Sequence, residues 1–136
     1  APIFVGGGVA HGPKGDNYKV NKINKKVRKI GLFHVLSKKN KINSLHVVED
    51  FKNEIKKTKL FNNFLEKNKL QNSLIILDKE SKTKIIRSAK NIPNLKVIDQ
   101  LGTNAYDILK YKNVIFTISS IKSFEERLSK WKKYTI

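Results

Sequence analysis

The stretch Leu74-Ile-Ile-Leu-Asp78 holds four consecutive apolar residues followed by an acid, a pattern typical of a strand buried on both faces. Three more short apolar runs occur in the chain, at Leu45–Val48, Leu95–Ile98 and Val114–Ile118. A strand with one face in water would alternate apolar and polar residues. These runs therefore favour a sheet covered by helices on both faces.

Apolar residues at helical spacing follow three of the four runs, and they are Leu60, Phe61, Phe64, Leu65, Ile85, Ile86, Ala89, Ile121, Phe124, Leu128 and Trp131. We expect Thr58 to cap the first of these helices. A short helix after Asn104 should be capped by that residue, with Asp107 reciprocating. Strands that alternate with helices predict right-handed crossovers. The fold expected is α/β: a three-layer α/β/α sandwich around a four-stranded, mainly parallel sheet.

The start of the chain follows a different pattern. Residues 1–20 contain five glycines and show no helical or strand periodicity, which predicts an extended ribbon without a core of its own. From residue 21 onward, helical spacing connects Ile23, Val27, Ile30 and His34. A second set lies on a face turned about 120° from the first, at roughly 100° per residue, and consists of Lys22, Lys25, Lys26 and Lys29. We expect a ribbon over residues 1–20 and a globular domain over residues 21–136. The first helix of that domain should have one face in the core and one face of cations.

The glycines do not match a nucleotide-binding loop. Counting from Gly7, a P-loop spacing reaches Gly12, but Pro13 stands where the lysine is needed and no hydroxyl follows. Counting from Gly6, a dinucleotide fingerprint needs a third glycine where His11 stands. Glycines also allow a backbone to approach another surface closely, and we favour that interpretation here.

The charge points to a polyanionic partner. The chain carries 29 Lys and Arg against 11 Asp and Glu, a formal net charge of +18. Residues 1–42 hold ten of these cations and one acid, so the first third has about twice the charge density of the rest. No apolar run approaches the roughly 20 residues that span a bilayer. The absence of cysteine excludes disulfides, thiolate nucleophiles and cysteine zinc sites.

Several stretches resemble the bacterial-type large-subunit ribosomal protein four family. They are Ala1-Pro-Ile-Phe-Val-Gly-Gly-Gly-Val-Ala-His-Gly-Pro-Lys14, Lys22-Ile-Asn-Lys-Lys-Val-Arg-Lys29, Leu45-His-Val-Val-Glu-Asp50, Lys57-Thr-Lys59, Ala89-Lys-Asn-Ile-Pro-Asn-Leu-Lys-Val97, Gly102-Thr-Asn-Ala-Tyr-Asp-Ile-Leu109 and the stretch from Thr117 to Leu128. The resemblance covers nearly the whole chain. It implies a non-catalytic α/β/α domain on the large ribosomal subunit. It also implies a long loop that runs into ribosomal RNA (rRNA) near the peptide exit tunnel.

The pattern of cations and the resemblance together indicate a binding role for particular residues, with Arg87, Lys90 and Asn91 as a secondary contact at a helix end. We expect rRNA contacts from Gly6, Gly7, Gly8, His11, Lys14, Lys19, Lys22, Lys25, Lys26, Arg28, Lys29, Arg87, Lys90 and Asn91. Expected partners are large-subunit rRNA and neighbouring ribosomal proteins, with no membrane, small-molecule substrate, cofactor or metal. The expected location is a ribosome, bacterial or organellar. The family's N-terminal part and basic loop tip are expected to precede Ala1, and some bacterial members also repress their own operon.

Two other functions remain open at this point. Acids follow the predicted strand ends at Glu49, Asp50, Asp78 and Asp99, where a parallel sheet gathers its sites. Such a cluster could bind Mg²⁺ and make the chain a small nuclease. The third possibility is an RNA-binding regulator that acts away from the ribosome.

Overall fold

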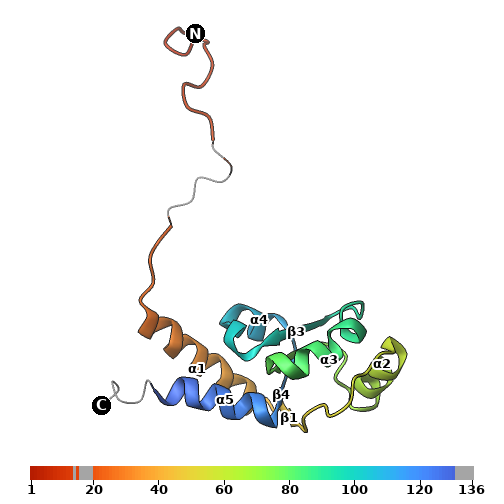
Figure 1. The fold of residues 1–136 in the computed structure, drawn as a ribbon. Helices are drawn as coiled ribbons and strands as arrows, with labels where there is room; N and C mark the ends of the chain where they lie inside the picture. Colours follow the sequence, from red (N-terminus) through yellow and green to blue (C-terminus); the bar gives the residue numbers. More distant parts are fainter. Residues whose placement is uncertain (14, 16–19, 131–136) are drawn as a thin grey trace.

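The computed structural model describes residues 1–13, 15 and 20–130. The elements, in chain order, are α1 (Lys25–Lys41), β1 (Leu45–Val48), α2 (Thr58–Lys67), β2 (Ser73–Leu77), α3 (Lys79–Ala89), β3 (Leu95–Asp99), the 3₁₀ turn η1 (Gln100–Gly102), α4 (Ala105–Lys110), β4 (Asn113–Thr117) and α5 (Ile118–Ser129). The strands form one parallel sheet in the order β1-β4-β2-β3. Figure 1 shows the helices arranged around this sheet. The predicted α/β sandwich is confirmed.

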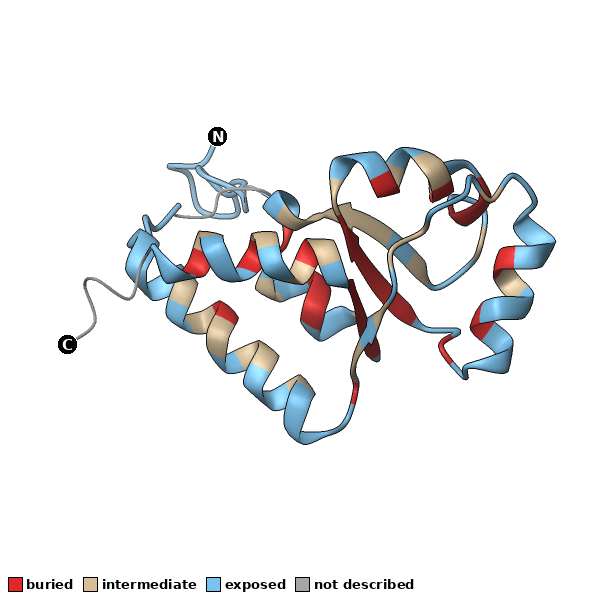
Figure 2. Cartoon of the chain, turned by 60° about the horizontal axis from the view of Figure 1, so that its bottom comes forward, coloured by how far each residue is buried: buried red, intermediate tan, exposed pale blue. Residues whose placement is uncertain are grey.

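The core has two sides because the central strands β2 and β4 are buried along their whole length. On one side, Leu74 and Ile76 of β2 pack with residues of α1, α4 and α5. On the other side, Ile75 and Leu77 pack with residues of α2 and α3. Figure 2 shows the buried residues concentrated in these strands and on the helix faces that cover them. The period-two alternation of a strand thus gives each layer of helices its own apolar surface.

The polar residues at the end of β4 set the start of α5. The Oγ of Ser120 accepts a hydrogen bond from the backbone N–H of Thr117 at 3.0 Å, and the Oγ1 of Thr117 accepts one from the N–H of Ser120 at 3.4 Å. This reciprocal cap turns the chain from strand to helix at Thr117. The prediction that the strand continues to Ile118 was therefore wrong by one residue, because Ile118 already belongs to α5.

The start of α2 also differs from the expectation. Thr58 is the first helical residue, and the preceding Lys57 occupies the capping position without a side-chain hydrogen bond. On the buried side of this helix, Phe61 and Leu65 are fully enclosed, whereas Leu60 remains 62% exposed. The helix was predicted correctly, but its cap was not.

The predicted core stripe of α1 is wrong at all four of its positions. Ile23, Val27 and Ile30 are 52%, 55% and 43% exposed, and His34 is exposed as well. Figure 1 shows the start of α1 projecting past the sheet, so only the later turns meet the core, chiefly through Leu32. In the part of the chain that the structure describes, no helix is both long and apolar enough to cross a membrane.

Removing the Ser120 hydroxyl should destabilise the domain. This fully buried Oγ also donates to the carbonyl oxygen of Ile76 at 2.8 Å, which ties the cap of α5 to the central strand. We expect Ser120→Ala to lower the free energy of unfolding by about 1–3 kcal/mol, because the N–H of Thr117 loses its acceptor. Urea denaturation measures this. The matched change Ser129→Ala, at an exposed hydroxyl, should cost far less, and equal costs would contradict the assignment.

Candidate nucleic-acid interface

The first turns of α1, with the residues just before them, form a compact cationic surface. We call it the basic end of α1, and it comprises Lys22, Lys25, Lys26, Arg28 and Lys29. All of these residues are exposed except Lys29, which is half-buried. The first turn of α1, every residue of which is described, contains no acid, and the capping Asn24 makes no side-chain hydrogen bond to it. The cations thus lie at the positive end of the helix dipole, where an anion is favoured.

The N-terminal ribbon is exposed at every residue that the structure describes. Two backbone hydrogen bonds fold its start, from the N–H of Phe4 to the oxygen of Ala1 at 3.1 Å and from the N–H of Gly7 to the oxygen of Phe4 at 2.8 Å. Gly6 has a φ of 78°, and a Cβ on Gly7 would lie 1.8 Å from the oxygen of Ala1. Both positions therefore require glycine.

Of the other ribbon residues predicted to bind RNA, Gly8 and His11 belong to the described part of the chain. Gly8 and His11 are exposed, and a Cβ on Gly8 would meet nothing within 4 Å. Lys14 and Lys19 lie outside the described residues. Neither a turn nor close packing within the chain therefore requires glycine at Gly8.

The remaining predicted residues belong to a different surface. Arg87, Lys90 and Asn91 are exposed at the end of α3. Because α3 packs on the opposite side of the sheet from α1, the structure does not bring these residues together with the basic end of α1. The predicted site is thus divided between two layers.

Two of the four acids at the strand ends, Asp50 and Asp99, make contacts within the fold, whereas Asp78 precedes α3 without a side-chain capping bond and Glu49 is exposed. The Oδ1 of Asp50 accepts hydrogen bonds from the Oγ and N–H of Ser119 at 2.5 and 3.2 Å, and the side-chain bond holds the pKa of Asp50 below its usual range. Asp99 pairs with Lys82 at 3.1 Å. Within residues 1–13, 15 and 20–130, no group of three or more His, Asp or Glu is placed to hold a metal ion. These contacts give no support to a nuclease.

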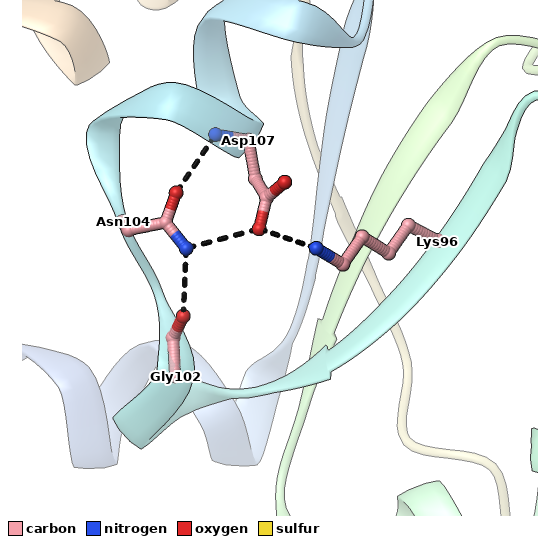
Figure 3. Close-up of polar contacts among 4 residues, drawn as sticks. All are labelled: Lys96, Gly102, Asn104 and Asp107. Atoms are coloured by element: carbon pink, nitrogen blue, oxygen red, sulfur yellow. Dashed lines mark hydrogen bonds and ion pairs between the residues drawn. The ribbon is translucent and has the colours of Figure 1, made fainter. Parts of the chain in front are cut away.

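A polar cluster before α4 also has a structural role, and Figure 3 shows its hydrogen bonds. The Oδ1 of Asn104 accepts from the N–H of Asp107 at 2.8 Å, as the predicted cap requires. The Oδ2 of Asp107 in turn accepts from the side chains of Asn104 at 2.9 Å and Lys96 at 2.8 Å. Burial alone would raise the pKa of Asp107, but the two hydrogen bonds together with the charges of Lys96 and Lys110 outweigh it and the pKa is lowered. The hydrogen bond to Asp107 also raises the pKa of Lys96.

Comparison with known proteins agrees with the sequence resemblance. Residues 1–127 match the model of the Ribosomal protein L4/L1 family. The chain belongs to this family. It is 55% identical over 130 residues to the large ribosomal subunit protein uL4 of Pelagibacter ubique, covering 95% of this chain and 63% of that protein. Identity to the uL4 proteins of Rickettsia akari and Hyphomonas neptunium is 40% and 37%, over 90% and 93% of this chain and 59% of each relative.

The chain spans about three fifths of the length of these relatives. The family is one of ribosomal proteins and not of enzymes, so membership agrees with the absence of catalytic motifs in the sequence.

One surface feature escaped the sequence analysis. A groove of about 520 Å³ lies between α2 and the loop from α3 to β3, and we call it the α2–α3 groove. Its lining residues are Thr58, Lys59, Asn62, Glu66, Gln71, Asn91, Ile92, Pro93 and Asn94. The groove brings together residues of the Lys57-Thr-Lys59 motif and of the Ala89–Val97 motif, which are far apart in the sequence. Only the packing of α2 against α3 reveals that they are neighbours.

The stability of the domain should depend on the charge of Asp107. Since its folded-state pKa is lowered, the charged form stabilises the fold above the ordinary pKa near 4, and this contribution is lost as pH falls through the folded-state value. We expect Asp107→Asn to lower the free energy of unfolding at pH 7 by about 1–2 kcal/mol. It should also flatten the loss of stability below about pH 4, measured by urea denaturation across pH.

The contribution of Asp50 persists in this variant, so the slope should decrease and not vanish. Glu125→Gln, at an exposed acid on α5, is the control for loss of one negative charge. The assignment fails if Asp107→Asn retains the acid dependence of the unmodified chain.

Proposed function

We propose that this chain is a structural part of the large ribosomal subunit and binds large-subunit rRNA through its ribbon and the basic end of α1. The observation that carries the proposal is the exposed cationic cluster at the start of α1, directly after a glycine-rich segment. Clustered cations at a helix start repel one another and the helix dipole, and each such unfavourable term is about 0.3–1 kcal/mol. A phosphate backbone would turn these repulsions into attraction.

The ribbon suits a path between RNA helices. Its described residues are exposed, and Figure 1 draws residues 1–13 apart from the sheet and its helices. Small residues such as Gly8 keep the backbone thin enough to approach phosphates and sugars closely. Ordering such a segment costs about 1–2 kcal/mol per residue, which contact with RNA would offset.

The proposal extends to location and partners. The relatives are named as large ribosomal subunit proteins of bacteria, so we place this chain on a bacterial ribosome beside other large-subunit proteins. In this proposal residues 1–20 form the returning limb of a loop directed toward the peptide exit tunnel, and residues 21–136 remain as the globular domain. The chain then contributes to subunit assembly and catalyses no reaction.

Reversing three charges at the basic end of α1 tests the proposal. The triple change Lys25→Glu, Lys26→Glu and Lys29→Glu should weaken binding to large-subunit rRNA at least tenfold near 0.1 M salt. The plot of log affinity against log salt should also become less steep. Its slope should fall in magnitude by roughly 2–3, because each lost phosphate contact removes about 0.7–0.9 from that magnitude. Filter binding over a salt series measures both quantities.

The matched control reverses three exposed lysines on other elements, Lys52, Lys67 and Lys122, and so keeps the same net charge. If the two triple variants lose equal affinity, only total charge matters and the basic end of α1 is not the interface. Sedimentation of the chain with large subunits in a lysate separates a ribosomal component from a free regulator, which would remain in the supernatant.

A further inference from the structure

We propose that the α2–α3 groove is a second RNA site, which takes one unpaired nucleotide and prefers guanine. The inference rests on the proposed function only in taking RNA as the partner. It concerns a different surface, because α2 and α3 cover the side of the sheet opposite α1. The groove volume of about 520 Å³ falls within the range of about 300–1,000 Å³ typical of small-ligand sites.

The walls of the groove are held in place by the fold. Phe61 and Leu65 anchor α2, and Ile85 and Ala89 anchor α3, in one buried cluster. The loop between α3 and β3 is fixed by a hydrogen bond from the N–H of Ser73 to the oxygen of Asn94 at 3.2 Å. The site is therefore built before RNA arrives, which lowers the entropic cost of binding.

The lining is rich in amides. Asn62, Gln71, Asn91 and Asn94 each offer donors and an acceptor to the groove, while Ile92 and Pro93 add apolar surface. Proteins recognise unpaired RNA bases partly by hydrogen bonds to the Watson–Crick edge, and amide side chains can make such bonds. The apolar side chains of Ile92 and Pro93 offer a surface for the face of the base.

The acid in the groove indicates which base fits. The Oε1 of Glu66 accepts a hydrogen bond from the Nδ2 of Asn62 at 2.7 Å, which orients the carboxylate. Its other oxygen, Oε2, takes no part in that bond. Guanine alone presents two adjacent donors, N1–H and N2–H, on its Watson–Crick edge, and a carboxylate accepts from both. Glu66 would repel a phosphate placed beside it, so the base and not the backbone must face this residue.

Exposed cations accompany the groove. Lys59 lines the groove, and Lys57 and Lys90 are exposed next to lining residues in the sequence. Arg87 is exposed in the last turn of α3. Together they can hold the phosphates on either side of an inserted base. This arrangement assigns Arg87, Lys90 and Asn91 to a site of their own, separate from the basic end of α1.

The experiment uses the full 136-residue chain and four RNA hexamers that are adenine at every position except one, which is G, A, C or U. Fluorescence anisotropy gives the affinities, and NMR follows the side-chain amides of Asn62, Gln71, Asn91 and Asn94. We expect the guanine hexamer to bind about fivefold to tenfold more tightly than the others, the low end for a two-bond base contact because the groove is open to water. Its binding should shift these amide signals.

Two pairs of variants locate the effect. Glu66→Gln replaces one acceptor by a donor and should reduce the guanine preference to less than twofold, whereas Glu126→Gln, at an exposed acid on α5, should leave it unchanged. Lys59→Ala should weaken all four hexamers about equally, and Lys67→Ala, further along α2 and outside the groove lining, should weaken them much less.

Equal affinity for the four hexamers would overturn the proposal, as would equal effects of Glu66→Gln and Glu126→Gln. The triple charge reversal at the basic end of α1 separates the two sites. If that variant loses rRNA binding but keeps the guanine preference, both proposals hold. If it binds rRNA normally while the preference depends on Glu66, the proposed function fails and this inference stands. If the triple variant loses rRNA binding and the unmodified chain shows no guanine preference, this inference alone fails.

Discussion

The pairing of β2 with β4 is the constraint on which the rest of the structure depends. Ser73 through Ile76 pair with Asn113 through Phe116, and every one of these residues is buried. Two parallel strands enclosed on both faces need a helical layer above and another below. Ser120 then connects the start of α5 to β2 through Ile76. The layer that carries α1 and the layer that carries the α2–α3 groove both follow from this pair of strands.

A core filled this way keeps most charged side chains at the surface, although Asp107 is buried and pairs with Lys96. The two buried clusters contain only apolar side chains, and the +18 net charge is distributed over the surfaces of both layers and the ribbon. Like charges at such density oppose the compact state, so a polyanion stabilises the fold as well as binding to it. In the two proposals, charge supplies the attraction to a polyanion, whereas the helix dipole at α1 and the amides of the groove select the places of contact.

The sequence predicted most of the fold because its strongest signals are local. Uninterrupted runs such as Leu74–Leu77 predict buried strands wherever they occur, and Asn104 capped α4 as its spacing indicated. The errors arose where tertiary structure overrides a local pattern. The apolar face of Ile23, Val27 and Ile30 has helical spacing, but the sheet ends before it, so these side chains remain exposed. Periodicity shows that a face is apolar and does not show what covers it.

The proposed binding surfaces were predictable in composition but not in arrangement. Cations beside glycines in one continuous stretch can be recognised from the sequence, and the basic end of α1 is such a stretch. The α2–α3 groove is different, because Lys59 and Asn94 are 35 positions apart and neither belongs to a motif with a known chemistry. Their proximity depends on the packing of α2 against α3 over β2. A site that recognises a base needs groups that converge from several directions, and only the fold provides such convergence. Affinity for phosphate depends on the number of cations, which the sequence composition already gives.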